Sequence, residues 1–191
     1  MPQDRPLIIG HAGGRGVVTT ACYLARQSGA RSAMAMFKAL ELCRDAGVMP
    51  PDMAKYKRVS GEIRQLFGEI TDIFEPVSLD EAYLDLGADQ RRDPGGVPAV
   101  LLSELAQRVK DQVGVTVSIG LSYNKFLAKL ASVEAKPRAT PAAIEPGPGV
   151  VVVAAGRERE FLDPLPVQRL WGVGPVTLDK LHRIGIRRVG C

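Results

Sequence analysis

Residues 77–86 read VSLDEAYLDL and set two carboxylates side by side, Asp80 and Glu81, within an apolar, strand-like run. Charged side chains are seldom buried unless they are paired or bind a metal ion. Neighbouring residues of a regular strand point to opposite faces of the sheet, so the two carboxylates converge only where the backbone is kinked. Pro76 cannot donate to a sheet ladder, and its position just before the acids favours such a kink.

A cation between two converging carboxylates removes their repulsion, and Mg²⁺ suits that position. Proteins hold Mg²⁺ with one or two carboxylates plus substrate phosphates, and two such ions can stabilise the attacking and the leaving oxygen of a phosphoryl transfer. The alternative is an exposed acid pair at a turn. Spacing alone favours that alternative, because adjacent Asp and Glu residues are common.

The segments around this run alternate between helical and strand patterns. Residues 53–70 repeat apolar side chains at steps of three and four after the helix start signal PPD at 50–52, and residues 99–113 are also amphipathic. Residues 115–121 alternate apolar and polar side chains, as a strand does, and residues 124–132 look helical. This order predicts an α+β fold, with an antiparallel or mixed sheet and its helices on one face.

The N-terminal part of the chain predicts shorter elements. Residues 7–9 and 17–22 are strand candidates, separated by a glycine-rich turn at 11–16. Residues 23–27 and 33–43 look like short helices.

Two segments lack clear periodicity. Residues 89–98 predict a loop from their composition, and residues 136–149, KPRATPAAIEPGPG, read as a linker rich in proline and alanine. Beyond them, residues 150–155 form a strand candidate and residues 157–161 a helix start.

Composition limits the class of protein. Hydrophobic residues make up 46% of the 191 residues, which argues against a disordered chain, and the net charge of +4 permits a polyanionic partner without requiring one. The three cysteines, Cys22, Cys43 and Cys191, fit neither a zinc site nor a disulfide framework, so we expect a reducing setting. No stretch approaches the roughly 18 apolar residues of a membrane span, and no signal peptide is evident. The expected location is the cytoplasm.

The stretch SLDEAYLD at 78–85 resembles the acidic palm motif of Y-family, translesion DNA polymerases, particularly the bacterial polymerase IV type. Other stretches resemble further parts of the same family in the same order: RGVVTTACYLARQSGARSAMAMFKAL (15–40) the finger segment, PPDMAKYKRVSGEIRQL (50–66) the palm helix, TVSIGLSYNKFLAKLAS (116–132) the strand and helix after the acidic motif, and PLPVQRLWGVGPVTLDKLHRIGI (164–186) the thumb. Several long motifs in a fixed order make a chance similarity remote.

The resemblance implies an incomplete ferredoxin-like palm with a small finger segment and a helix-hairpin-helix thumb. It assigns residues 1–50 to the finger segment, 51–140 to the palm, 141–163 to a variable linker and start of the thumb, and 164–191 to the thumb. It also implies a reaction, in which a primer 3′-hydroxyl attacks the α-phosphate of a dNTP with the help of two Mg²⁺ ions. The implied partners are primer-template DNA, the dNTP and, for the full-length protein, a sliding clamp. A monomer is expected.

By the same resemblance, Asp80 and Glu81 are the catalytic metal ligands. Tyr23 and Arg26, in ACYLAR, match the residues that hold the triphosphate in this family. Their chemistry suits that role, because arginine makes fork-shaped contacts to phosphate oxygens and a tyrosine hydroxyl can add another. The alternative is an ordinary surface pair.

Lys136, in AKP, matches a lysine that reaches the phosphates from the palm. The match is poorer here, because the family usually has aspartate where Val133 stands and glycine where Ala139 stands.

Other residues of the motifs are expected to contact DNA. Lys125 and Lys129, in the stretch after SYN, are candidate DNA or nucleotide contacts, and solvated lysines at a polar helix start are the alternative. Gly172 and Gly174 permit close approach of the backbone to a phosphate, and Lys180 adds sequence-independent attraction.

The remaining residues of the last segment are given structural roles. Pro175 suits the first turn of a helix and Gly185 its C-terminal cap. Trp171 is expected to pack against the fold, and a plain helical hairpin is the alternative to a DNA clamp.

The chain departs from the family pattern at its start. A member normally begins with a strand that carries another metal-binding aspartate and precedes the steric gate, and Asp4 has the wrong neighbours for that role. Losing such a ligand is expected to cost about 3–4 kcal/mol of transition-state stabilisation. We therefore expect this chain alone to polymerise poorly, with a gap or an exposed edge in the palm sheet. The alternative functions are a non-catalytic DNA-binding relative, a degraded fragment that keeps the fold and, more remotely, an unrelated α+β phosphate-binding protein.

Overall fold

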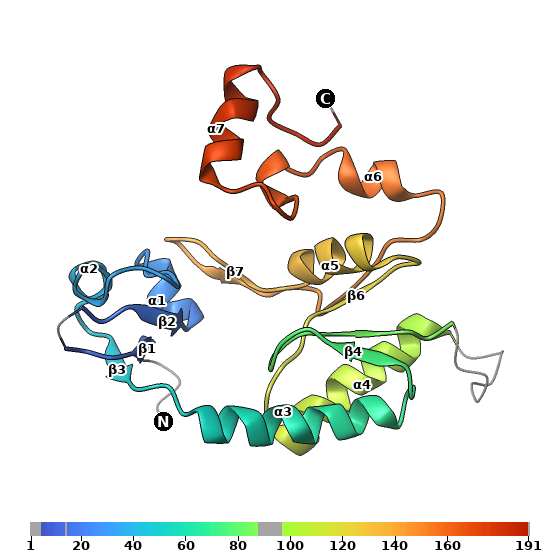
Figure 1. Cartoon of the computed structure of the whole chain (residues 1–191), viewed down its shortest axis with the longest axis horizontal. Helices are drawn as coiled ribbons and strands as arrows, with labels where there is room; N and C mark the ends of the chain where they lie inside the picture. The colour runs from blue at the N-terminus through green and yellow to red at the C-terminus, as the bar shows by residue number, and fades with distance from the viewer. Residues whose placement is uncertain (1–4, 14, 88–96, 191) are drawn as a thin grey trace. The chain divides into compact units, whose positions relative to one another are not determined.

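The computed structural model describes residues 5–13, 15–87 and 97–190 (Figure 1). The predictions for Asp4, Cys191 and most of the loop at 89–98 lie outside these residues. In chain order the elements are β1 (Leu7–Gly10), β2 (Val18–Ala21), α1 (Tyr23–Gln27), α2 (Met36–Leu42), β3 (Gly47–Met49), α3 (Met53–Gly68), β4 (Phe74–Pro76), β5 (Ala82–Leu84), α4 (Pro98–Val113), β6 (Ile119–Leu121), α5 (Lys125–Glu134), β7 (Arg138–Ala139), β8 (Ile144–Glu145), β9 (Val150–Val152), α6 (Glu158–Leu162), η1 (Val167–Arg169) and α7 (Pro175–Arg183).

The chain divides into two compact units. Unit 1 comprises Met1–Ser60 and Pro137–Gly147, and unit 2 comprises Gly61–Lys136 and Pro148–Cys191. Within the described ranges, no helix combines the length and the apolar character needed to cross a bilayer.

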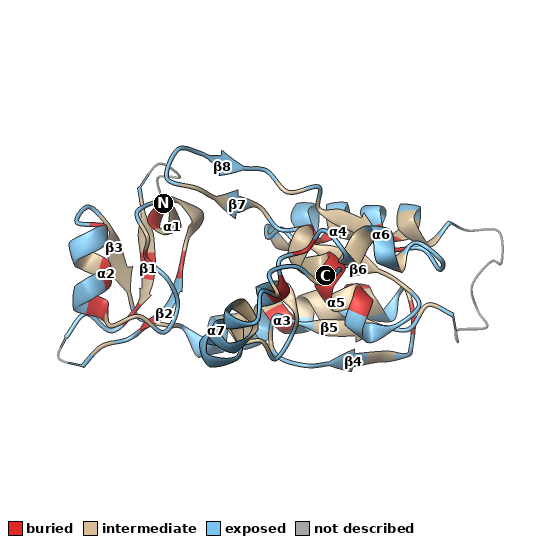
Figure 2. Ribbon diagram, turned by 90° about the horizontal axis from the view of Figure 1, so that it is seen from above, coloured by how far each residue is buried: buried red, intermediate tan, exposed pale blue. Residues whose placement is uncertain are grey.

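Unit 1 is built on a small mixed sheet in the order β2-β1-β3, with β1 antiparallel to β2 and parallel to β3. Its core contains Ile8, Val18, Ala25 and Ala39, which are all buried. The outer residues of α2 are exposed, whereas Met36 and Ala39 face the core (Figure 2).

The helix predicted over 33–43 is shorter than expected and spans Met36–Leu42. Ala33 has a φ of +65°, outside the right-handed helical region, so the helix cannot extend back to it.

The segment predicted as a linker contains a short hairpin, so that prediction was wrong in part. Strands β7 and β8 pair antiparallel through Arg138–Glu145 and Ala139–Ile144, and both strands pack against α1. Composition missed the hairpin because its stability depends on a tertiary contact rather than on a local apolar pattern.

Unit 2 contains two separate strand pairs. β4 and β5 form an antiparallel hairpin, and β6 pairs in parallel with β9. In the part of the chain that the structure describes, β5 and β6 belong to different sheets.

The strand predicted over 115–121 pairs only from Ile119 to Leu121. Residues 115–118 keep the alternating pattern, but no strand among residues 5–13, 15–87 and 97–190 pairs with them, and β9 supplies partners for three residues only.

Helices cover both faces of the β6–β9 pair, whereas the sequence predicted helices on one face. Ile119 and Leu121 join the cluster formed by α3 and α4. Gly120 points the other way, and a Cβ placed on it would lie 2.0 Å from the carbonyl oxygen of Ala128 in α5. Helix α5 therefore approaches β6 more closely than any side chain at position 120 would allow.

The last segment is helical, as predicted, with η1 and α7 separated by a turn. Pro175 is the first residue of α7, and Gly185 follows its C-cap with a φ of +86°. Trp171 does not pack as expected, because 87% of its surface is exposed.

Candidate functional site

The acid pair lies at the tip of the β4–β5 hairpin. Strand pairing runs from Phe74–Leu84 to Pro76–Ala82, and beyond it the N–H groups of Val77 and Ser78 both donate to the carbonyl of Glu81, at 2.9 and 3.1 Å. The backbone bends over residues 78–80, so the kink predicted between Pro76 and the acids is confirmed. The break begins after Pro76 rather than at Glu75, because Pro76 still ends β4.

Ser78 organises the bend that presents Asp80. Its hydroxyl donates to Asp80 Oδ1 at 2.6 Å and accepts from the backbone N–H of Asp80 at 3.2 Å. The carbonyl of Ser78 in turn accepts from Arg64 Nη2 of α3 at 3.0 Å. The sequence analysis did not single out Ser78 or Arg64, although serine is a known turn residue because its hydroxyl can bond the backbone N–H two residues on.

Helix α5 supplies lysines to the same hairpin. Lys129 Nζ forms an ion pair with Glu81 Oε1, and Lys125 Nζ forms one with Glu75 Oε2. Lys125 also lies over the ring of Tyr83, 5.4 Å from its centroid. The start of the helix is fixed by Asn124, whose Oδ1 accepts from the N–H of Leu127 at 2.9 Å. Both lysines predicted as DNA contacts are thus engaged within the protein, and their role toward DNA stays a prediction.

The acid pair has the right chemistry for a divalent ion. Asp80 and Glu81 are both exposed, and carboxylate oxygens are the ligands that Mg²⁺ prefers. Asp85 makes a local hydrogen bond instead: its Oδ1 accepts from the backbone N–H of Gly87 at 2.9 Å. No cluster of three or more His, Cys, Asp and Glu side chains occurs among the described residues. Binding of a divalent ion by the pair stays a prediction.

Tyr23 and Arg26 lie together on α1 in unit 1. The guanidinium carbon of Arg26 is 5.5 Å from the centroid of the Tyr23 ring, and Arg26 Nε donates to the carbonyl of Ala21 at 2.8 Å. The predicted shared face is confirmed by this contact. The stacking and the hydrogen bond orient the guanidinium, as bidentate phosphate binding requires. Binding of a triphosphate by the two residues stays a prediction.

Lys136 lies just beyond Ala135, the C-cap of α5, and is exposed. Its backbone N–H donates to the carbonyl of Val133 at 3.3 Å, which continues the last helical turn. Its contact with phosphate also stays a prediction.

The turn before α7 has the backbone geometry expected of a phosphate contact. Gly172 has a φ of +89°, a conformation that costs glycine little and other residues more. Gly174 is the N-cap of α7 and, as a glycine, has no side chain that could cap the helix. Lys180 is exposed on the same helix, whereas Arg183 forms an ion pair with Asp179 at 2.7 Å. This arrangement exposes backbone N–H groups at the start of α7.

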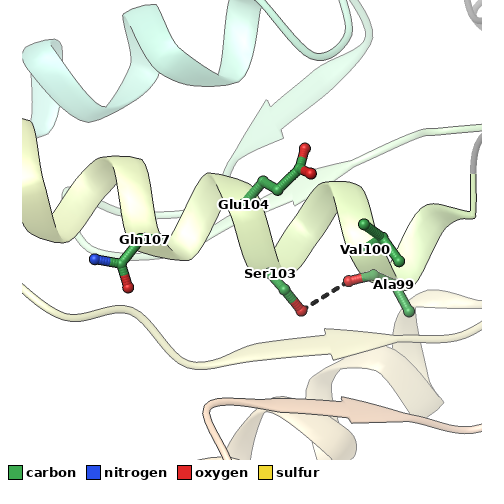
Figure 3. Close-up of a pocket in the computed structure, with 5 residues that line it drawn as sticks. All are labelled: Ala99, Val100, Ser103, Glu104 and Gln107. Carbon is green, nitrogen blue, oxygen red and sulfur yellow. Dashed lines mark hydrogen bonds between the residues drawn. The ribbon is translucent and has the colours of Figure 1, made fainter.

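A hollow on α4 is the other surface feature of unit 2 (Figure 3). It is lined on one side of the helix by Ala99, Val100, Ser103, Glu104 and Gln107. The hydroxyl of Ser103 already donates to the carbonyl of Ala99 at 2.9 Å, and the lining includes no residue of the acidic hairpin. We therefore do not assign the chemistry of the chain to this hollow.

Comparison with known families accounts for most of the chain. The profile of the impB/mucB/samB family matches residues 1–133, and the profile of the IMS family HHH motif matches residues 155–186. The second match contains the glycine turn and α7.

Individual proteins give the same result. DNA polymerase IV of Brucella melitensis is 48% identical over 188 residues, which are 98% of this chain and 40% of that protein. DNA polymerase IV of Caulobacter vibrioides is 48% identical over 98% of this chain and 44% of its own length. This chain thus spans less than half of the length of these relatives.

Solved structures extend the comparison to the fold. The crystal structure of DinB from Sulfolobus solfataricus superimposes with a TM-score of 0.83 at 28% identity, over 97% of this chain and 52% of that one. An insertion ternary complex of Dbh DNA polymerase gives a TM-score of 0.81 at 28% identity, with the same coverage of 97% and 52%. These likenesses support the predicted α+β polymerase fold.

Proposed function

The chain belongs to the impB/mucB/samB family, that of the Y-family DNA polymerases, and from this we propose that it carries the catalytic part of a template-directed translesion DNA polymerase of the bacterial polymerase IV type. The observation that carries the proposal is the acid pair Asp80–Glu81, presented at a hairpin tip whose bend is held by Ser78 and Arg64. An idle acid pair does not need such support.

The proposed substrates are a dNTP and primer-template DNA. Asp80 and Glu81 would hold Mg²⁺, and a divalent ion bound there would supply positive charge to the triphosphate. The carboxylates fix the position of that charge, and Ser78 fixes the position of Asp80. We propose two such ions, as the family resemblance implies.

Other residues bind the substrates and leave the chemistry to the acid pair. Arg26 and Tyr23 contact the phosphates of the dNTP, and Lys136 adds a further positive charge. The backbone N–H groups of the first turn of α7 that follow Pro175, with Lys180, hold the DNA backbone without reading its sequence. In the reaction the primer 3′-hydroxyl attacks the α-phosphate and pyrophosphate leaves.

We propose that residues 1–50 serve as the finger segment, 51–140 as the palm, 141–163 as the start of the thumb and 164–191 as the thumb. These functional parts are not the compact units of the fold, since Pro137–Gly147 packs with unit 1. A monomer is the proposed functional state.

Metal-dependent nucleotide binding tests the proposal. A fluorescent dNTP is added to the 191-residue chain with and without Mn²⁺, and binding is followed by anisotropy. Asp80→Asn and Glu81→Gln should each weaken the metal-dependent affinity roughly tenfold or more, since even residues that merely support a metal ligand are worth that much. Glu75→Gln removes the same charge from the same hairpin and should leave the affinity unchanged. Equal affinities for all four proteins would contradict the proposal.

Primer extension tests the completeness of the site. Because no group of three or more His, Cys, Asp and Glu side chains occurs among the described residues, the 191-residue chain alone should extend a primer poorly with Mg²⁺ and dNTPs. Robust extension by this chain would show that two carboxylates suffice.

A further inference from the structure

Two lysines one helical turn apart hold the β4–β5 hairpin against α5. Lys125 pairs with Glu75, and Lys129 pairs with Glu81. Residues four apart lie on the same face of a helix, so both ion pairs join this face of α5 to the same hairpin. They differ first in their acids, because Glu81 belongs to the proposed metal site and Glu75 does not.

The two pairs also differ in exposure. The side chains of Lys129 and Glu81 are 31% and 40% exposed, whereas those of Lys125 and Glu75 are both 61% exposed. Water screens the attraction between charges less where they are less exposed. The ammonium of Lys129 is thus the better-placed positive charge for the acid pair.

The backbone of Lys129 is held in place by packing, whereas its side chain can change conformation. Its carbonyl accepts from the hydroxyl of Ser132 at 2.8 Å, and the next residues, Leu130 and Ala131, are buried. Close packing at Gly120 holds this part of α5 on β6. The ammonium, however, is carried on a flexible four-carbon stem and can leave Glu81 without moving the helix.

We propose that Lys129 is a resident counter-charge of the acid pair, which a divalent ion must displace from Glu81 in order to bind. The inference rests on the proposed function of Asp80 and Glu81 as metal ligands. Without the ion, the ammonium relieves the repulsion between the neighbouring carboxylates and keeps the hairpin tip folded. It also weakens binding of the ion to the free protein, so that metal binds well only together with the negatively charged triphosphate.

The test measures binding of Mn²⁺ alone to the 191-residue chain, by electron paramagnetic resonance of the free ion. Lys129→Met should bind Mn²⁺ about fivefold more tightly than the parent, since removing a charge at contact distance is worth on the order of 1 kcal/mol. Lys125→Met is the matched control and should stay within about twofold of the parent. Lys129→Arg keeps the charge and should keep the parental affinity.

Thermal unfolding gives a second measurement that does not depend on activity. Without metal, Lys129→Met should unfold at a lower temperature than Lys125→Met, and added Mn²⁺ should raise its midpoint by more.

The outcomes separate the inference from the proposed function. If Glu81→Gln binds Mn²⁺ as well as the parent does, the metal site itself is wrong. If Glu81→Gln weakens binding but Lys129→Met binds no more tightly than Lys125→Met, the metal site stands and the role of Lys129 is overturned.

Discussion

Lys129 on α5 forms an ion pair with Glu81 at the tip of the β4–β5 hairpin, although the two residues are 48 positions apart in the sequence. The pair connects the proposed metal ligand to a helix whose own position is set by β6. Any change that moves α5 off β6 should therefore disturb the acid pair as well as the core.

Gly120→Ala tests the close packing of α5 on β6 on which this dependence rests. An added Cβ would lie 2.0 Å from the carbonyl oxygen of Ala128 and 2.4 Å from the backbone nitrogen of Ser132, so α5 must shift. The free energy of unfolding, measured in urea, should fall by about 1–3 kcal/mol or more. Gly61→Ala is the control, because a Cβ there meets nothing within 4 Å, and it should stabilise α3 by about 0.5–1 kcal/mol. Equal effects of the two substitutions would contradict the close packing.

Arg26→Ala should weaken binding of a dNTP roughly tenfold or more, because it removes a charge-assisted contact to phosphate. Arg26→Lys should recover only part of the affinity, since lysine cannot reproduce both the Nε hydrogen bond to Ala21 and the stacking on Tyr23. Lys38→Ala, on the exposed face of α2, removes the same charge within unit 1 and serves as the control. If Lys38→Ala and Arg26→Ala weaken binding equally, Arg26 contributes only general charge.

Lys180→Ala should weaken DNA binding to the same extent for all sequences. It should also reduce the slope of log K against log salt by about 1, because one fewer phosphate charge is neutralised. Lys110→Ala on α4 is the charge-matched control, and its slope should equal that of the parent. Fluorescence anisotropy at several salt concentrations measures both quantities, and an unchanged slope for Lys180→Ala would exclude a phosphate contact.

Tyr123 and Glu158 give a dependence on pH. The hydroxyl of Tyr123 donates to Glu158, which lowers the pKa of that carboxyl and raises the pKa of the tyrosine. The interaction thus stabilises the fold above the unfolded pKa of glutamate, about 4, and below that of tyrosine, about 10. It is lost as the pH falls through the lowered pKa of Glu158, or rises through the raised pKa of Tyr123.

The difference in melting temperature between the parent and Tyr123→Phe should therefore be largest near neutral pH and should shrink in acid. Parallel curves down to pH 2 would contradict a contribution from this hydrogen bond.

The sequence predicted the elements whose apolar pattern is local. Helices α3 and α4 were predicted from their repeating apolar positions, and they begin at Met53 and Pro98. It could not predict how far β6 is paired, because that depends on the length of β9, which is far away in the chain.

The candidate site was also predicted only in part, namely where its residues are close together in the sequence. The acid pair and the kink before it were read from residues 76–81, because proline and adjacent acids leave a local signal. The ion pair of Lys129 with Glu81 and the hydrogen bond from Arg64 leave no such signal, since both join distant segments. Trp171 was misjudged because large aromatic side chains are usually buried, whereas this one is exposed.

The most direct test of the central claim is the location of a bound divalent ion. Crystals of the 191-residue chain, soaked with Mn²⁺ and a non-hydrolysable dNTP analogue, can be measured at a wavelength where manganese scatters anomalously. We predict an anomalous peak within ligand distance of the carboxylates of both Asp80 and Glu81, with Lys129 turned away from Glu81. A nucleotide bound with its metal elsewhere, and with Glu81 still paired to Lys129, would contradict the account.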